Sequence, residues 1–140
     1  MSQGRDIIME QDGPLWRGRF AAMASPCECL IRGVSESLAR RSIQCVAEEV
    51  WRIEHKFSRY RDDNLMATIN NASGQWVALD DETARLLDFA DQCWRLSEGA
   101  FDITSGVLRR AWQFDGSDCL PEQAQIDTLL PLVGWQKVDR

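Results

Sequence analysis

The feature that most constrains the fold is one long amphipathic helix predicted between Ser35 and Phe57. Ser35 is a good N-cap residue, and the acidic Glu36 follows in the first turn. Apolar side chains then recur at spacings of three and four, which places them on one helical face. They are Ala39, Ile43, Val46, Val50, Ile53 and Phe57. We expect this stripe to be buried and the charged residues between its members to face water.

A second long helix is predicted after residue 80, with Asp80 or Asp81 as its cap and Gly99 as its end. Its expected inner face is Thr83, Leu86, Leu87, Ala90, Cys93, Trp94 and Ser97. Two shorter helices are predicted, one capped by Asp63 and carrying Leu65, Met66 and Ile69, and one from Pro121 to about Leu130.

Strands are predicted on both sides of these helices. Residues 15–32 are rich in apolar and β-compatible types and break near Ser25-Pro26, which predicts two strands. Short strands are also predicted at 76–79 and 133–138. Strands and helices alternate without a repeat or a flexible linker, so we expect one domain over 1–140 of the α+β or mixed α/β class, with two long helices packed on a small sheet.

The charge and cysteine content exclude several classes of protein. The formal net charge is −6, which disfavours nucleic-acid binding because that rests on clustered Lys and Arg. The five cysteines are odd in number and lack disulfide-scaffold spacing, so we expect free thiols. No export signal or bilayer-length apolar run is present, and we expect a cytoplasmic protein without a membrane segment.

Metal-binding and hydrolytic motifs are weak. Cys27 and Cys29 form a C-x-C pair on one expected strand face, where buried small residues are the better interpretation than a metal site. The chain's one histidine, His55, lies on a charged helix flank and is expected to be a surface residue. No serine has a G-x-S-x-G turn, so nucleophilic hydrolysis has no support.

Three segments, in order along the chain, match one family. The segment 57–65, FSRYRDDNL, with Ile69-Asn70 after it, is similar to the family pattern FSxYxxxSxL…xN. The segment 97–108, SEGAFDITSGVL, followed by 111–114, AWQF, resembles SxGAFDxTxGxLxxxWxF. Residues 22–28, AMASPCE, take the place of an MGT-type segment. The chain thus resembles the ApbE family of flavin transferases from about Phe20 to its end.

This resemblance implies a reaction and a set of binding residues. Members of the family are FAD:protein FMN transferases: they move FMN from FAD onto a Thr or Ser of an acceptor flavoprotein, with release of AMP and with magnesium as the usual metal. The family contacts to FAD carry over to Met23, Tyr60, Ala100, Phe101 and Asp102.

The resemblance also has limits. Asn64 stands where the family usually has Ser, and Ala24-Ser25-Pro26 replaces Gly-Thr. The family's Gly-rich GGxxKGxA segment and its metal-binding Asp and Ser or Thr have no counterpart here. We therefore expect a partial, flavin-facing half of an ApbE-like FAD-binding domain, with unassigned catalytic residues, no metal ligands of its own and no turnover alone.

Each marked residue also has a structural interpretation. Tyr60 either stacks on a flavin or adenine ring or covers a core edge. Asp102 accepts hydrogen bonds from ribityl or ribose hydroxyls, caps the turn at 104–108, or does both. Met23 lies against a ring or belongs to the core. At the level of function, a non-catalytic FAD-binding or flavin-carrier module and a plain interaction domain remain alternatives to the transferase.

Overall fold

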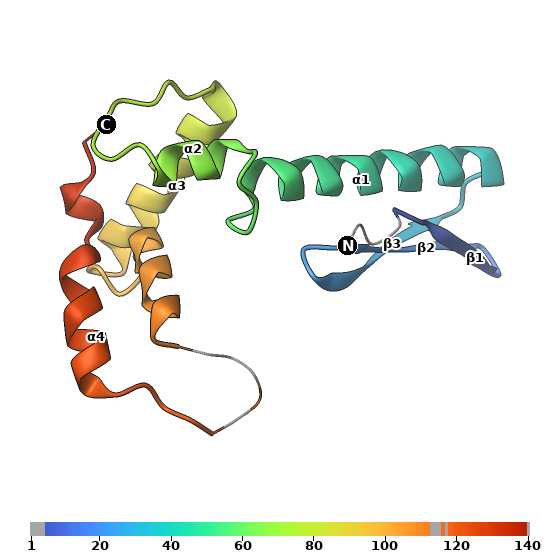
Figure 1. The fold of residues 1–140 in the computed structure, drawn as a ribbon. Coiled ribbons are helices and arrows are strands. Elements are labelled where there is room, and N and C mark those ends of the chain that lie inside the picture. Colours follow the sequence, from blue (N-terminus) through green and yellow to red (C-terminus); the bar gives the residue numbers. More distant parts are fainter. Residues whose placement is uncertain (1–4, 113–115, 117, 140) are drawn as a thin grey trace. The chain divides into compact units, whose positions relative to one another are not determined.

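The structure is a computed structural model that describes residues 5–112, 116 and 118–139. The chain divides into two compact units, Met1–Val77 and Ala78–Arg140, and each is described by itself. The first unit holds a three-stranded sheet and two helices, and the second holds helices and short 3-10 segments (Figure 1).

The sheet of the first unit is a meander of three antiparallel strands. β1 (Ile8–Asp12), β2 (Leu15–Ala22) and β3 (Ser25–Arg32) follow one another in chain order. Two-residue turns join them, because Asp12 pairs with Leu15 and Ala22 pairs with Ser25. The two strands expected within 15–32 are confirmed, and β1 is an additional edge strand. On β3 the odd positions from Cys27 to Ile31 are half-buried and the even ones exposed.

Helix α1 (Glu36–Phe57) lies along one face of this sheet (Figure 1). Ser35 caps it as predicted, accepting a hydrogen bond from the Leu38 N–H. Its buried face differs from the expected stripe: Val46 and Ile53 are exposed. The buried positions follow a strict spacing of four. They are Ala39, Ile43, Ala47 and Trp51.

Small residues on both elements lie at the contact between α1 and β2. Ala39 and Ala47 are fully buried, and Gly18 of β2 faces Ile43 so closely that a Cβ there would lie 2.2 Å from Ile43 Cγ2. The two alanines and Gly18 therefore allow the helix to approach the sheet closely at these positions. Trp51 completes this core and meets Phe20 edge to face at 5.8 Å between ring centroids.

The segment after α1 corrects two expectations. The short helix α2 (Leu65–Asn70) exists, but its cap is Asn64, which accepts a hydrogen bond from the Ala67 N–H, and not Asp63. Residues 76–79 form no strand, and Trp76 is 79% exposed. An apolar tetrapeptide forms a strand only where a neighbouring strand pairs with it, and no such neighbour is present among the described residues.

The second unit begins with α3 (Asp81–Leu96). Asp80 caps it through the N–H and hydroxyl of Thr83, and the backbone turns away at Glu98 and Gly99, both with positive φ. Thr83 and Ala90 of the expected inner face are buried, whereas Leu86 is exposed.

Short helical segments make up the rest of this unit. The 3-10 helix η1 (Ile103–Arg110) is followed by α4 (Gln123–Leu129), η2 (Leu130–Leu132) and η3 (Trp135–Lys137). The predicted helix from Pro121 to about Leu130 thus corresponds to α4. The predicted strand at 133–138 is wrong, because Gly134 and Trp135 are bonded to the Asp102–Thr104 turn instead of to a strand. The family motif also runs into Gln113 and Phe114, which lie outside the described residues.

The observed mixture of an antiparallel sheet and helices confirms the α+β class. In the described part of the chain, no helix has the length and apolar character needed to cross a membrane. All five cysteines are free thiols in the structure.

Candidate functional site

Met23 lies in the turn between β2 and β3, and its backbone is strained. Met23 and Ala24 have φ values of 51° and 55°, a left-handed conformation that costs most non-glycine residues free energy. The Met23 N–H donates to Glu54 Oε1 at 2.6 Å, which ties the turn to the last turns of α1. The thioether side chain is 55% exposed, so the interpretation of Met23 as a core residue is wrong.

Tyr60 follows α1 in the loop that leads to α2. Its side chain is 73% exposed, so it does not cover a core edge. The guanidinium of Arg59 lies 5.2 Å from the ring centroid and donates to the phenol oxygen at 3.3 Å, and the Tyr60 N–H donates to Ser58 Oγ. The loop thus presents an aromatic ring beside a cation, on the surface of the first unit.

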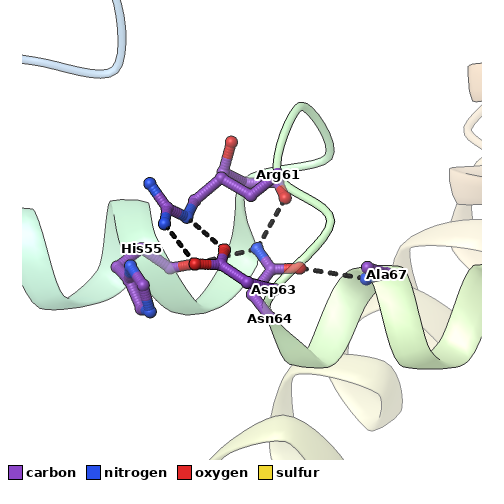
Figure 2. Close-up of polar contacts among 6 residues, drawn as sticks. His55, Arg61, Asp63, Asn64 and Ala67 are labelled. Carbon is purple, nitrogen blue, oxygen red and sulfur yellow. Dashed lines mark hydrogen bonds and ion pairs between the residues drawn. The ribbon is translucent and has the colours of Figure 1, made fainter. Parts of the chain in front are cut away.

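The loop that carries Tyr60 is held in place by Asn64. Its amide nitrogen donates to the carbonyl oxygens of His55 at 2.8 Å and Ser58 at 2.7 Å, while its amide oxygen caps α2 (Figure 2). A serine hydroxyl has one proton and cannot donate to both carbonyls, so Asn64 in place of the family's Ser serves this local geometry. His55 itself is exposed, as predicted.

Asp63, the expected cap, instead forms an ion pair with Arg61 (Figure 2). Arg61 Nε donates to Asp63 Oδ1 at 2.7 Å, and a second guanidinium nitrogen donates to Oδ2, in a bidentate arrangement. The hydrogen bond with Arg61 lowers the pKa of Asp63, and the same bond raises the pKa of Arg61. Both groups are solvent-exposed, so the pair contributes little to folding.

Ala100 and Phe101 form the turn that follows α3 in the second unit. The backbone reverses at Gly99, with φ of 84°, and the Phe101 N–H donates to Ser97 Oγ at 2.9 Å. Ala100 is exposed, and the Phe101 ring is 47% exposed. The turn therefore presents a small residue and an apolar ring side by side on the surface of this unit.

Asp102 is the best-connected of the predicted site residues. Its Oδ1 accepts hydrogen bonds from the Thr104 N–H at 2.8 Å and the Thr104 hydroxyl at 2.6 Å, and its Oδ2 accepts one from the Trp135 N–H at 2.8 Å. Asp102 is the N-cap of η1, so the structural interpretation of this residue is confirmed. The ligand-binding interpretation stays a prediction.

The hydrogen bonds favour the ionised form of Asp102. Partial burial raises the pKa of this carboxyl, but donation by the Thr104 hydroxyl and by the N–H groups of Trp135 and Thr104, with the charge of Lys137, lowers it further than burial raises it. The net pKa lies below its ordinary value. A carboxylate of this kind is an acceptor for hydroxyl groups and not a partner for phosphate.

The predicted site residues fall into two local groups. Met23 and Tyr60 belong to the first unit and lie in loops attached to the end of α1, and Ala100, Phe101 and Asp102 belong to the second unit. Two supporting residues, Glu54 and Thr104, are not among the predicted site residues. Thr104 was visible as the Thr of the GAFDxT pattern, whereas the contact between Glu54 and Met23 joins residues far apart in the sequence and has no local pattern.

The described residues contain no cluster of metal-ligating side chains. Among them, no three His, Cys, Asp or Glu side chains are grouped in a way that would hold a metal ion. Cys27 and Cys29 are half-buried on β3. We therefore assign no step of any reaction to a metal held by this part of the chain.

Comparison with known proteins decides the family. The model of the ApbE family matches residues 23–140, a range that includes all five predicted binding residues and both of the supporting residues. The chain belongs to the ApbE family. The crystal structure of the ApbE protein from Thermotoga maritima is similar to it, with a TM-score of 0.78 and 26% sequence identity.

That match covers 89% of this chain and 41% of the Thermotoga maritima ApbE protein, so the chain spans less than half the length of this relative. No curated protein matches the chain significantly.

Proposed function

We propose that this ApbE-family chain provides the flavin-binding part of a FAD:protein FMN transferase. The observation that carries the proposal is the family match over 23–140, which spans Met23, Tyr60 and the 100–102 turn. FAD is the proposed substrate, and a flavoprotein with a Thr or Ser hydroxyl is the proposed acceptor.

Three large side chains at these positions are accessible to a ligand. Met23, Tyr60 and Phe101 are 55%, 73% and 47% exposed, although a thioether and two aromatic rings gain free energy from burial. Each is held by backbone hydrogen bonds to Glu54, Ser58 or Ser97 and not by core packing. Side chains presented in this way are suited to contact the planar rings of a dinucleotide.

Ala100 and Asp102 support a complementary polar role. Ala100 offers little bulk next to Gly99, so a ligand can approach the backbone closely. Asp102 is ionised, and each of its two oxygens has two lone pairs, so the three hydrogen bonds it accepts leave capacity for a ribityl or ribose hydroxyl. Asp102 is thereby proposed to orient the sugar part of FAD while it caps η1.

The proposed reaction is a phosphoryl-type transfer. The hydroxyl oxygen of the acceptor residue forms a bond to the FMN-side phosphorus, and the pyrophosphate P–O bond breaks as AMP leaves with the electron pair. The proton of the acceptor hydroxyl is released to solvent in this step. The contribution of the described residues is to bind and orient FAD, which lowers the entropic cost of the attack.

Flavin titration tests the binding role. The fluorescence of FAD at fixed concentration is followed as the chain is added, for the wild type, for Phe101→Ala and for a matched control, Phe89→Ala. Phe89 is a 63% exposed phenylalanine on α3 of the same unit. We expect weaker binding for Phe101→Ala alone. Equal affinities for all three proteins would contradict the assignment of Phe101.

Chromatography of the same mixtures for AMP shows whether this chain turns FAD over. Release of AMP in the presence of magnesium and an acceptor flavoprotein would support the transferase and overturn the expectation that this chain has no turnover alone. Binding of FAD without AMP release fits both the flavin-binding part of a transferase and a flavin carrier, and absence of any flavin binding would refute the proposal and favour an interaction domain.

A further inference from the structure

Thr104 joins two segments of the second unit that lie 30 residues apart in the sequence. Its hydroxyl donates to Asp102 Oδ1 at 2.6 Å and accepts a hydrogen bond from the Gly134 N–H at 2.8 Å. The neighbouring Trp135 N–H donates to the other carboxylate oxygen of Asp102 at 2.8 Å. These bonds close a ring between the 102–104 turn and the 134–135 segment, which we call the Thr104 clamp.

The 134–135 side of the clamp is anchored in its turn to α3. The Trp135 side chain is only 5% exposed, and its Nε1–H donates to Asp91 Oδ1 at 2.9 Å. Asp91 also pairs with Arg95 one helical turn further on. Lys137 donates to the carbonyl oxygens of Pro131 and Val133, which fixes the backbone immediately before the clamp. The clamp therefore connects a surface turn to a buried indole and to the longest helix of the unit.

Capping of η1 does not require this arrangement. A cap needs one side-chain oxygen that accepts a backbone N–H, and Asp102 Oδ1 accepts that of Thr104. The hydroxyl of Thr104 and the second carboxylate oxygen are extra to the cap, and both are used to hold Gly134 and Trp135. With both carboxylate oxygens engaged, the side chain of Asp102 has one fixed orientation.

We infer that Thr104 is a positioning residue for the flavin-binding turn 100–102, acting through Asp102 and the 134–135 segment. The inference rests on the proposed function, because it assumes that this turn contacts FAD. Ala100 and Phe101 directly precede Asp102, so a fixed Asp102 also restricts the backbone that presents them. Preorganisation of this kind improves affinity because less conformational freedom is lost on binding.

The test uses four variants of the full chain. Thr104→Val keeps the shape and removes the hydroxyl, Thr104→Ala removes it without adding bulk beside the carboxylate, and Thr104→Ser restores it. Thr128→Ala is the matched control, because the Thr128 hydroxyl donates to Gln125 O within α4. Each protein is examined by circular dichroism, by FAD titration and by amide hydrogen exchange at Gly134.

The inference predicts faster exchange of the Gly134 amide in Thr104→Val and Thr104→Ala. FAD binding should weaken by on the order of tenfold, because the 100–102 turn loses the two hydrogen bonds that restrict it before binding. Thr104→Ser is expected to restore both properties, and Thr128→Ala to change neither. Rescue by serine is the decisive readout, because a general loss of packing would not depend on the hydroxyl.

Other outcomes overturn the inference in distinguishable ways. If the wild type binds FAD and the Val and Ala variants bind it equally well, the positioning role is wrong while the proposed function stands. An unchanged Gly134 amide, or unfolding of both variants, likewise refutes positioning by the hydroxyl. If the wild type fails to bind FAD, the proposed function falls and the inference falls with it.

Discussion

Replacing Tyr60 by alanine separates a binding role from a folding role, because the two predict opposite patterns. Tyr60 is 73% exposed, and the contact over its ring comes from the neighbouring Arg59 at 5.2 Å. The Tyr60 N–H bond to Ser58 Oγ is a backbone interaction and survives the substitution. The change therefore removes an exposed ring and leaves the loop's anchor intact.

The two expected magnitudes differ. An exposed cation–π contact contributes about 0.5–1 kcal/mol, so the free energy of unfolding should fall by no more than about 1 kcal/mol. If the ring stacks on the isoalloxazine or adenine of FAD, binding should weaken by roughly 1–3 kcal/mol, by analogy with base–aromatic stacking. A loss of that size corresponds to an increase in Kd of roughly 5- to 150-fold.

Urea unfolding and flavin titration measure the two quantities on the same samples, with Trp76→Ala as the matched control. Trp76 is a 79% exposed aromatic residue of the same unit outside the family motif. An unchanged Kd for Tyr60→Ala, or an equal loss of affinity in Trp76→Ala, would show that Tyr60 does not contact FAD.

Three further substitutions test the structure itself. Gly18→Ala should lower the free energy of unfolding by about 1–3 kcal/mol, because the new Cβ atom would lie 2.2 Å from the buried Ile43 side chain. Unchanged stability in denaturant unfolding would refute the close approach of α1 to β2. Ala24→Gly should stabilise the chain by on the order of 1 kcal/mol, since Ala24 has φ of 55°, and a loss of stability in the same assay would contradict this conformation. Asp102→Asn should be less stable than the wild type mainly above pH 5. A carboxylate whose pKa is lowered in the folded state stabilises the fold above its unfolded pKa, which is about 3.9. That contribution is lost as the pH falls through the folded pKa. A stability difference between Asp102→Asn and the wild type that does not shrink on acidification would argue against the Asp102 hydrogen bonds.

Local rules predicted much of the helical structure. Ser35 and Asp80 cap the two long helices as their sequence patterns indicated, and Gly99 ends the second one with a positive φ. Each of these features depends on residues within one or two turns, where capping and backbone propensity act. The turn at Gly13-Pro14 also carried a hairpin pattern, with glycine at its first position, that would have revealed β1.

Long-range packing explains most of the errors. Hydrophobicity alone favoured Val46 and Ile53 for the buried face of α1, but the helix turns Ala47 and Trp51 toward β2, where both belong to one buried cluster with Phe20. The segment 133–138 has strand-like residues, yet its backbone bonds to the Asp102–Thr104 turn. Neither choice is encoded in a local periodicity.

The candidate site could also be predicted only in part. Family motifs marked Met23, Tyr60 and the 100–102 turn, and the structure places the three large side chains among them at the surface. The residues that hold them lie elsewhere in the sequence: Glu54 for the Met23 turn, and Trp135 for Asp102. Contacts of this kind follow from the fold and are therefore invisible before it is known.

The most direct test of the account is a two-dimensional amide NMR titration of the wild-type chain with FAD. If the chain binds flavin as proposed, the amide signals of Met23, Tyr60 and residues 100–102 should shift and saturate as FAD is added, while those along the exposed face of α4 should not move. Shifts confined to α4 or to the middle of α1, or no shifts at saturating FAD, would contradict the central claim that these family positions contact flavin.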